Sequence, residues 1–390
     1  MNMNQHETTY VGQRLFNYVT PFMKLKTLIT LVALAFQLSA RAQNIVLDTS
    51  HLQIQARAYV LEKYKGVDAI YLQGGAITAK NVSFLNGTIE YDIFLKEERG
   101  FPGVYFRGQD DTDDAEYFYL RPHQSGNPDA NQAIPRTRGI SPWQLYYGPR
   151  YSFPYNYHYN DWTHVKLVVL DDKAQVFLDH SEQPNLSWNL FHEAKAGKVV
   201  FTGGNTSGLH LANLKIDHKD PTLVDFKPIT RKPIDDLINS WQISDMFEEK
   251  LLDNPDSLEL IIKSREWMGK VGVEEGTAAN ISRIRSLRRE PGNTVFAKVE
   301  INSEKDQLKL LEFGYSDRVV LVLNGKPVYR GTNRFQSRDY RYLGTVGLFD
   351  AIYINLTKGK NTLLIAVSED FGGWLVTARI QDKRGIKIKN

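Results

Sequence analysis

Residues 87–123 read GTIEYDIFLKEERGFPGVYFRGQDDTDDAEYFYLRPH, and this stretch indicates the fold class. It holds three short runs rich in Val, Ile, Tyr and Phe, at residues 88–95, 103–107 and 116–121, separated by Gly, Pro and Asp. Such runs between turn residues are typical of β-strands. Because no helical pattern intervenes, the stretch predicts a β-sandwich or barrel.

The same pattern continues on both sides of this stretch. Similar runs recur as far as residue 217 and again over residues 294–380, where Asn324-Gly325 is a strong hairpin turn. Between them lies a segment with Pro221, Pro228 and Pro233, which reads as a linker. We therefore predict an all-β chain of two β-sandwich (jelly-roll) domains, at residues 43–218 and 235–390. The linker spans residues 219–234, and a short helical lead-in opens the second domain.

Bulk composition agrees with a soluble globular protein. The 390 residues are 42% hydrophobic and 24% charged, which is enough to bury two cores. The formal net charge of +3 gives no reason to expect a nucleic-acid partner. Cysteine is absent, so the sequence excludes disulfides, thiolate zinc sites and a cysteine nucleophile.

The N-terminal segment predicts export. Lys24 and Lys26 follow Met23, residues 28–38 are apolar, and Ala40-Arg41-Ala42 fits a signal-peptidase site. Residues 1–42 would then be an N-terminal extension and signal peptide that starts near Met23, with the mature protein secreted or periplasmic. A short membrane anchor is the alternative, but the apolar run is shorter than the roughly 20 residues that span a bilayer. After cleavage we expect no transmembrane segment and, without cysteine, no lipid anchor.

Two family resemblances follow from particular motifs. NGTIEYD at residues 86–92, GVYFR at 103–107, EYFYLRPH at 116–123 and DWTHVKLV at 161–168 resemble the concanavalin A-like jelly rolls. That group includes laminin G-like and keto-glycoside hydrolase-like domains of exported bacterial proteins. VLNGK at 322–326 and KGKNTLLI at 358–365 resemble galactose-binding-like modules. The resemblance implies jelly-roll folds and carbohydrate as the partner, but one fold hosts many functions.

Alternation along two of these strands predicts a binding face. Val104, Phe106, Phe118 and Leu120 would face the core, so the opposite side would carry Tyr and Arg. Aromatic rings pack on sugar C–H surfaces and arginine donates paired hydrogen bonds. We predict a saccharide site on the concave face of the first sandwich, from Tyr105, Arg107, Tyr117, Tyr119, Arg121, His123, Gln124, Asn127, Asp129, Trp143, Gln144 and Tyr146. Tyrosines that merely cover an outer sheet are the alternative.

Catalytic residues are harder to find. A retaining concanavalin A-like glucanase carries E-x-D-x-x-E on one strand, and Glu90 and Asp92 supply the first two carboxylates. Leu95 stands where the second glutamate should be, which argues against that hydrolase type. If the protein is an enzyme, a glycoside hydrolase-like or lyase-like activity would use Glu116, Arg121 or His123 as acid or base.

Metal and cofactor signals are sparse. Asp110, Asp111 and Asp113 cluster in one loop and could hold Ca²⁺, although a solvated acidic turn explains them as well. The nine histidines show no metal-site spacing, and no phosphate-binding or dinucleotide fingerprint is present. We therefore expect no cofactor other than calcium.

Three functions remain open from sequence: a carbohydrate-binding protein, an enzyme of polysaccharide breakdown, and a structural or adhesion surface protein. One feature of the concave face separates the first two. A carboxylate pair about 5 to 9 Å apart would favour the enzyme, whereas an aromatic strip without such a pair would favour binding.

Overall fold

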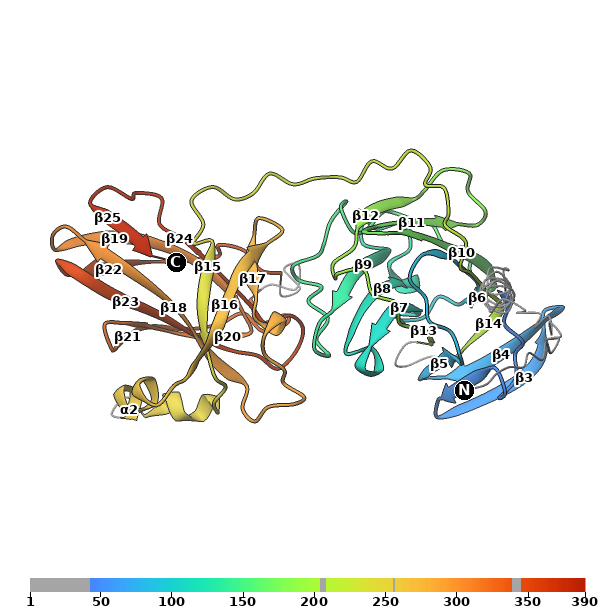
Figure 1. The fold of residues 1–390 in the computed structure, drawn as a ribbon, viewed down its shortest axis with the longest axis horizontal. Helices are drawn as coiled ribbons and strands as arrows, with labels where there is room; N and C mark the ends of the chain where they lie inside the picture. The colour runs from blue at the N-terminus through green and yellow to red at the C-terminus, as the bar shows by residue number, and fades with distance from the viewer. Residues whose placement is uncertain (1–42, 204–207, 255–256, 339–344, 390) are drawn as a thin grey trace, which may run out of the picture. The chain divides into compact units, whose positions relative to one another are not determined.

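The computed structural model describes residues 43–203, 208–254, 257–338 and 345–389, so the predicted signal segment lies outside the described residues. Ala42–Asn390 form one compact unit. Its strands lie in antiparallel sheets with a few short helices, which confirms the all-β prediction (Figure 1). No helix in the described part of the chain is long and apolar enough to cross a membrane.

The first sandwich has one large sheet in the strand order β12-β11-β10-β6-β14-β4-β3, with β1 added against β14. Its strands are β1 (Gln43–Asn44), β3 (Ala58–Tyr64), β4 (Val67–Gln73), β6 (Gly87–Leu95), β10 (Asp161–Leu170), β11 (Lys173–Leu178), β12 (Leu186–Asn189) and β14 (Gly208–Asp217). We call this the eight-stranded sheet.

The second sheet of this sandwich has the order β2-β5-β13-β7-β8-β9. Its strands are β2 (Leu52–Gln55), β5 (Ala76–Ala79), β7 (Gly103–Gln109), β8 (Asp114–Leu120), β9 (Asn131–Arg136) and β13 (Lys198–Thr202). Short 3-10 turns η1 (Asp110–Thr112) and η2 (Pro122–Gln124) flank β8. We call this the six-stranded sheet.

The core of the first sandwich lies between these two sheets. Val104 and Phe106 of β7 and Phe118 and Leu120 of β8 are fully buried there, as the alternation predicted. From the opposite sheet, the odd-numbered residues of β6 from Ile89 to Leu95 enter the same core. The even-numbered residues of β6 therefore face outward.

No strand lies between Asp217 and Ser240 in the described residues, the region of the predicted linker (Figure 1). Backbone N–H of Val224 donates to the Gln175 side chain of β11 at 2.9 Å, and Gln175 donates back to the Val224 carbonyl at 2.6 Å. This part of the linker is thus tied to strand β11 of the first sandwich.

The second half of the chain forms one folded sheet with the order β21-β20-β23-β18-β15-β16-β17-β24-β19-β22, and β25 pairs with β18. The strands are β15 (Ser240–Ser244), β16 (Trp267–Glu274), β17 (Ala278–Asn280), β18 (Thr294–Ser303), β19 (Gln307–Ser316), β20 (Arg318–Leu323), β21 (Lys326–Thr332), β22 (Asp350–Leu356), β23 (Gly359–Ser368), β24 (Leu375–Arg379) and β25 (Ile386–Lys389). Helical pieces are η3 (Glu249–Asp253), α2 (Leu258–Lys263) and η5 (Ile281–Arg283).

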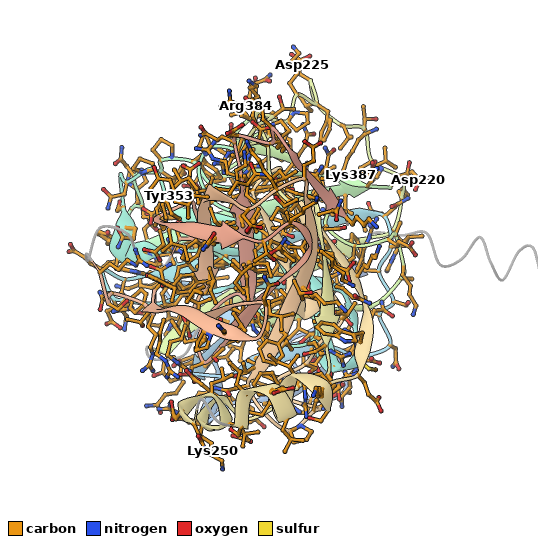
Figure 2. The ribbon with its side chains drawn as sticks, turned by 90° about the vertical axis from the view of Figure 1, so that its left-hand side faces the viewer. Asp220, Asp225, Lys250, Tyr353, Arg384 and Lys387 are labelled. Atoms are coloured by element: carbon orange, nitrogen blue, oxygen red, sulfur yellow. The ribbon has the colours of Figure 1, made fainter. Side chains whose placement is uncertain are left out.

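Strand β16 links the two layers of this second sandwich. Its first residues pair with β15 and its last residues pair with β17, so the sheet folds over between them. Trp241, Phe313 and Trp374 are fully buried in the core enclosed by the fold. Tyr353 of the edge strand β22 is 71% exposed (Figure 2).

Candidate functional site

The predicted tyrosines lie together on the outer side of the six-stranded sheet. Tyr105 stacks on Tyr117 with ring centroids 3.9 Å apart, and Tyr117 stacks on Tyr119 at 4.9 Å. Because they stack face to face, much of each ring face is already covered by its neighbour. Tyr117 and Tyr119 are 8% and 4% exposed, so this ladder offers little open ring surface to a sugar.

Arg121 stands at the end of this ladder and is held by three side chains. Its Nη1 donates to Asp129 at 2.8 Å, and its Nη2 donates to Gln132 Oε1 at 2.8 Å and to the Tyr119 hydroxyl at 3.1 Å. Sequence reasoning did not find Gln132, which pairs opposite Tyr119 in β9. Register across β8 and β9 is what brings these groups together.

The loop after Arg121 holds three further predicted residues. The His123 ring meets Phe101 edge-to-face at 5.3 Å, and the Arg121 guanidinium lies over the same Phe101 ring at 5.9 Å. Asn127 is exposed and donates to Gln124 Oε1 at 2.6 Å. Arg121, His123 and Asp129 thus form one neighbourhood, with Gln124 and Asn127 on the adjacent surface loop.

Arg107 does not share this face, so its predicted placement is wrong. The pairing of β7 with β8 shifts between Phe106 and Gln109, and Arg107 has a φ of 54° within that bulge. Its guanidinium is turned the other way and donates to the Leu85 carbonyl at 2.8 Å and the Asp171 carbonyl at 2.7 Å. The side chain therefore joins the two sheets of the sandwich.

Trp143, Gln144 and Tyr146 contact the second half of the chain. Gln144 Oε1 accepts from the Gly373 backbone N–H at 2.7 Å, and the Tyr146 hydroxyl donates to Glu274. The Trp143 ring lies 6.1 Å from Phe335 and 6.3 Å from Phe371. Gln144 and Tyr146 are each 1% exposed, so of these three only Trp143 presents an accessible side chain.

Of the three catalytic candidates, Glu116 is not brought together with Arg121 and His123. Glu116 lies on the core-facing side of β8 and accepts backbone N–H groups from Phe191 at 3.0 Å and His192 at 2.9 Å. Burial raises the pKa of Glu116 to about 7, with these N–H groups and Arg107 opposing the rise. His123 lies beyond Leu120, and the strand from Glu116 to Leu120 alone spans roughly 13 Å.

The predicted calcium ligands are all engaged with cationic side chains. Asp113 accepts from Arg288 at 3.1 Å and Arg289 at 3.0 Å, Asp110 lies 3.5 Å from Arg289, and Asp111 pairs with Lys198. Within the described residues, no cluster of three His, Cys, Asp or Glu could hold a metal ion. The acidic loop therefore forms ion pairs here.

The β3 edge of the eight-stranded sheet curls over the outer side of that sheet. In a flat sheet β3 would lie about 14 Å from β6, because β14 and β4 separate them at about 4.8 Å per step. Yet Tyr64 of β3 approaches Phe94 of β6 to 4.9 Å between ring centroids and stacks on His210 of β14 at 3.6 Å. All three rings are on the outer side, so the β3 edge of the sheet curls toward that side, and we call this outer side the concave face.

Two carboxylates and a histidine lie on this concave face. His164 of β10 pairs across from Asp92 of β6, and its Nδ1 lies 2.6 Å from Asp92 Oδ1. The other ring nitrogen lies 3.5 Å from Glu90 Oε2. Glu90 and Asp92 are alternate residues of one strand, which places them about 7 Å apart along β6.

Glu90, Asp92 and His164 shift one another's pKa values. Hydrogen bonding from His164 lowers the pKa of Glu90 to about 2, against the effect of burial. Burial alone would raise the pKa of Asp92, but hydrogen bonds from His164 and Asn213 hold it below its ordinary value. Burial opposes protonation of His164, yet the two carboxylates raise its pKa to about 9. At neutral pH the site is an imidazolium between two carboxylates.

The fold gives a geometric reason for the incomplete glucanase pattern. Leu95 faces the core and is 2% exposed, so a carboxylate at that position could not join Glu90 and Asp92. The next residue on their face is Phe94, which packs against Trp162 at 5.5 Å. Glu90 and Asp92 were noted in the sequence as two carboxylates of this pattern but were not included in the predicted saccharide site. The histidine of the DWTHVKLV motif was the signal that could have corrected this.

Two buried nitrogen atoms of the same face have no hydrogen-bond partner among the described residues. They are the indole Nε1 of Trp162 and Nδ1 of His210. The other nitrogen of His210 lies 2.9 Å from Glu62 Oε1. An unpaired buried polar group costs about 1–3 kcal/mol, so each would gain from a ligand group that pairs with it. Sequence reasoning did not single out either residue.

A pocket of about 440 Å³ lies elsewhere, beside Tyr146, Phe191 and linker residue Ile229. Four of its charged side chains form pairs, Arg150 with Glu275 and Arg283 with Glu274, and a fifth, Arg231, lies over the Tyr147 ring. Of the residues predicted for the saccharide site, Tyr146 alone lines it. We do not assign a ligand to this pocket.

Comparisons with known proteins return structural likenesses alone. No protein-family model matches the chain, and no curated protein sequence matches it. A carbohydrate-binding module, CBM66 from Bacillus subtilis, is similar with 14% identity and a TM-score of 0.33, covering 43% of this chain and 96% of its own. A Bacillus licheniformis β-glucanase is 10% identical with a TM-score of 0.34, covering 46% of this chain and 98% of its own.

A Bacillus subtilis protein of unknown function with a galectin-like fold is 11% identical, with a TM-score of 0.33 and coverage of 46% and 94%. All three neighbours are thus described by carbohydrate-associated activities or folds. At these scores the likeness carries no argument about what this chain does. The concanavalin A-like and galactose-binding-like resemblances therefore stay predictions, and function has to be argued from the site.

Proposed function

We propose that this protein is exported and binds carbohydrate on the concave face of its first sandwich. The observation that carries the proposal is the juxtaposition of Trp162 with the Glu90–His164–Asp92 group on that face. An aromatic ring beside fixed hydrogen-bonding groups matches a sugar, which has an apolar C–H surface and a rim of hydroxyls. The curvature of the sheet lets such groups surround a ligand.

Trp162 supplies the apolar part of the site. Its ring contacts with Tyr64 and Phe94 are both edge-to-face, with interplanar angles of 79° and 77°. No parallel ring among the described residues stacks on it, in contrast to the tyrosine ladder of the six-stranded sheet. Trp162 is also partly exposed, so a sugar could pack against it.

The charges of the face favour a neutral ligand. Charges of both signs alternate on it: Glu90, Asp92 and exposed Asp179 lie among His164, Lys166 and Lys215, Lys215 lies 2.8 Å from Glu90, and Glu62 pairs with His210. Neither an anion nor a cation gains a clear advantage from this arrangement. Hydroxyl groups, which both donate and accept, fit it better.

Hydrolysis is the second candidate, because Glu90 and Asp92 place two carboxylates on one face. Glycoside hydrolases use such a pair but need one carboxylic acid that holds a proton. Here the pKa values of both Glu90 and Asp92 are lowered, so neither holds a proton at neutral pH. This difference favours binding over hydrolysis.

Export rests on the signal-like residues 23–42 alone. Expression in a Gram-negative host, followed by N-terminal sequencing of the released protein, would test it. We expect Gln43 as the first residue. An intact N-terminus retained in the cytoplasm would contradict the export part of the proposal.

Binding is tested by screening the full chain against an array of neutral plant, algal and microbial glycans. The Glu90→Gln variant should lose at least tenfold in affinity for any glycan that binds. Glu312→Gln is the matched control, because Glu312 and Glu90 side chains are both 21% exposed and both pair with a cation on an outer sheet face. Equal affinity for both variants would sink the site, and release of reducing sugar would favour the hydrolase.

A further inference from the structure

A second polar site is built around Arg121 at the edge of the six-stranded sheet. Asp129, Gln132 and the Tyr119 hydroxyl occupy both terminal nitrogens of its guanidinium. The remaining Nε is buried and has no partner among the described residues. Held by three side chains, the guanidinium cannot readily turn to satisfy this N–H group itself.

His123 presents a second unpaired nitrogen in the same place. Its Nδ1 is buried and lacks a partner within the part of the chain that the structure describes. His123 and Arg121 share the Phe101 ring, whose centroid lies 5.3 Å from the imidazole centroid and 5.9 Å from the guanidinium carbon. Both side chains with an unpaired nitrogen atom therefore contact the same aromatic ring.

The surroundings of these atoms are positively charged. Burial lowers the pKa of His123, and the positive charges of Arg121 and exposed Arg99 lower it further, whereas the Asp129 carboxylate raises it. An anionic acceptor would reverse this balance, because it would take an N–H from each side chain and favour protonation of the imidazole.

Access to the site comes from its polar rim. The Arg121 side chain is 14% exposed and that of Asp129 is 41% exposed. The loop residues Gly126, Asn127 and Pro128 next to it are exposed as well. The rim is thus open to solvent, while the unpaired nitrogens lie behind it.

We propose that Arg121 and His123 bind the carboxylate of an acidic sugar, such as a uronic acid residue of a polysaccharide. Arg121 Nε and His123 Nδ1 each donate one hydrogen bond to the carboxylate, and the sugar ring packs against Phe101. This site is separate from the concave face, on a different sheet, and it does not depend on the neutral-glycan site proposed there. Its ligand is an anion, whereas the concave face would bind a neutral sugar, so the two sites would bind different residues of one polymer.

The experiment follows the His123 ring by NMR while pH is varied, in the full chain with labelled histidine. The probes are hexagalacturonic acid, its fully methyl-esterified form, and acetate at equal carboxylate concentration. We expect hexagalacturonic acid to raise the His123 midpoint by at least half a pH unit, and the neutral ester to leave it unchanged. The Arg121→Gln variant should bind the acid at least tenfold more weakly, whereas His158→Gln, a change at an exposed histidine, should not.

Three outcomes would overturn the inference: no shift with hexagalacturonic acid, an equal shift with the ester, or an equal shift with acetate. The last would show a general carboxylate site without sugar recognition. If Arg121→Gln does not fold, His123→Gln provides the same affinity comparison. Glu90→Gln must leave the His123 shift intact, so failure of the concave-face proposal and failure of this one remain distinguishable.

Discussion

His164 Nδ1 lies 2.6 Å from Asp92 Oδ1, across the antiparallel pair of β10 and β6. This contact fixes the orientation of the imidazole and leaves its other nitrogen facing Glu90. His180 stacks on the imidazole with centroids 4.0 Å apart and covers one face of it. The ring is thus held from several sides, which makes the concave face a preorganised polar surface.

The first prediction concerns the protonation of His164. Because the pKa of the folded-state group is raised from 6.5 to about 9, its stabilising effect is complete below pH 6.5 and is lost as the pH rises through 9. For a largely buried pair the effect is on the order of 2 kcal/mol. Asp92→Asn should lower the His164 pKa by at least one unit, measured by NMR titration.

A stability measurement checks the same prediction. The difference in free energy of unfolding between the native chain and His164→Gln should shrink between pH 6.5 and pH 9.5. A constant difference over this window would mean that the ring does not carry the charge that we assign to it.

Arg107 should be a structural residue of the first sandwich. It is 4% exposed and its guanidinium donates to Leu85, Asn86 and Asp171, so Arg107→Met removes three part-buried hydrogen bonds. We expect a loss on the order of 3 kcal/mol in urea unfolding. Arg384→Met is the control, because the Arg384 side chain is 91% exposed (Figure 2) and its loss should cost less than about 0.5 kcal/mol. Similar losses for both arginines would contradict the assignment.

Glu116 also makes the stability of the fold depend on pH, but here burial, and not an ion pair, raises the pKa. Burial raises its pKa from 4.5 to about 7, so the folded chain holds this proton more tightly than the unfolded chain. Its contribution to stability therefore decreases as the pH rises from 4.5 to 7. Glu116→Gln removes this loss and should gain about 3 kcal/mol relative to the native chain between pH 4.5 and pH 8.

Urea unfolding at both pH values measures that gain. Glycan affinity of Glu116→Gln should match the native chain, since Glu116 faces the core. A stability difference between Glu116→Gln and the native chain that does not change with pH would contradict the raised pKa of Glu116. A large loss of glycan affinity would contradict its position on the core-facing side of β8.

Much of the fold could be predicted from the sequence because strand alternation is local. Val104, Phe106, Phe118 and Leu120 are buried as their spacing requires. The same rule failed at Arg107, one residue past Phe106, because a bulge after Phe106 reverses the side of the sheet that the next residue faces. Such a bulge is hard to predict from sequence when the residue with positive φ, here Arg107, is not a glycine.

The site was predicted less well because its shape depends on distant strands. Tyr64 and Phe94 are 30 positions apart in the sequence, and they meet at 4.9 Å only once the eight-stranded sheet curls. The tyrosine-rich strands pointed to the other sheet, where Tyr105 and Tyr117 stack on each other. Composition identified the aromatic residues, but curvature decides which of them line a concave face.

The most direct test of the central claim measures glycan binding by Trp162→Phe. This change keeps an aromatic ring but removes the unpaired indole N–H. Trp267→Phe is the matched control, since Trp267 is also partly exposed but lies in the second sandwich under Lys298. For a glycan that binds the native chain, isothermal titration calorimetry should show at least a fivefold weaker affinity for Trp162→Phe and no change for Trp267→Phe. Unchanged affinity for Trp162→Phe, with both variants folded, would contradict a saccharide site on the concave face.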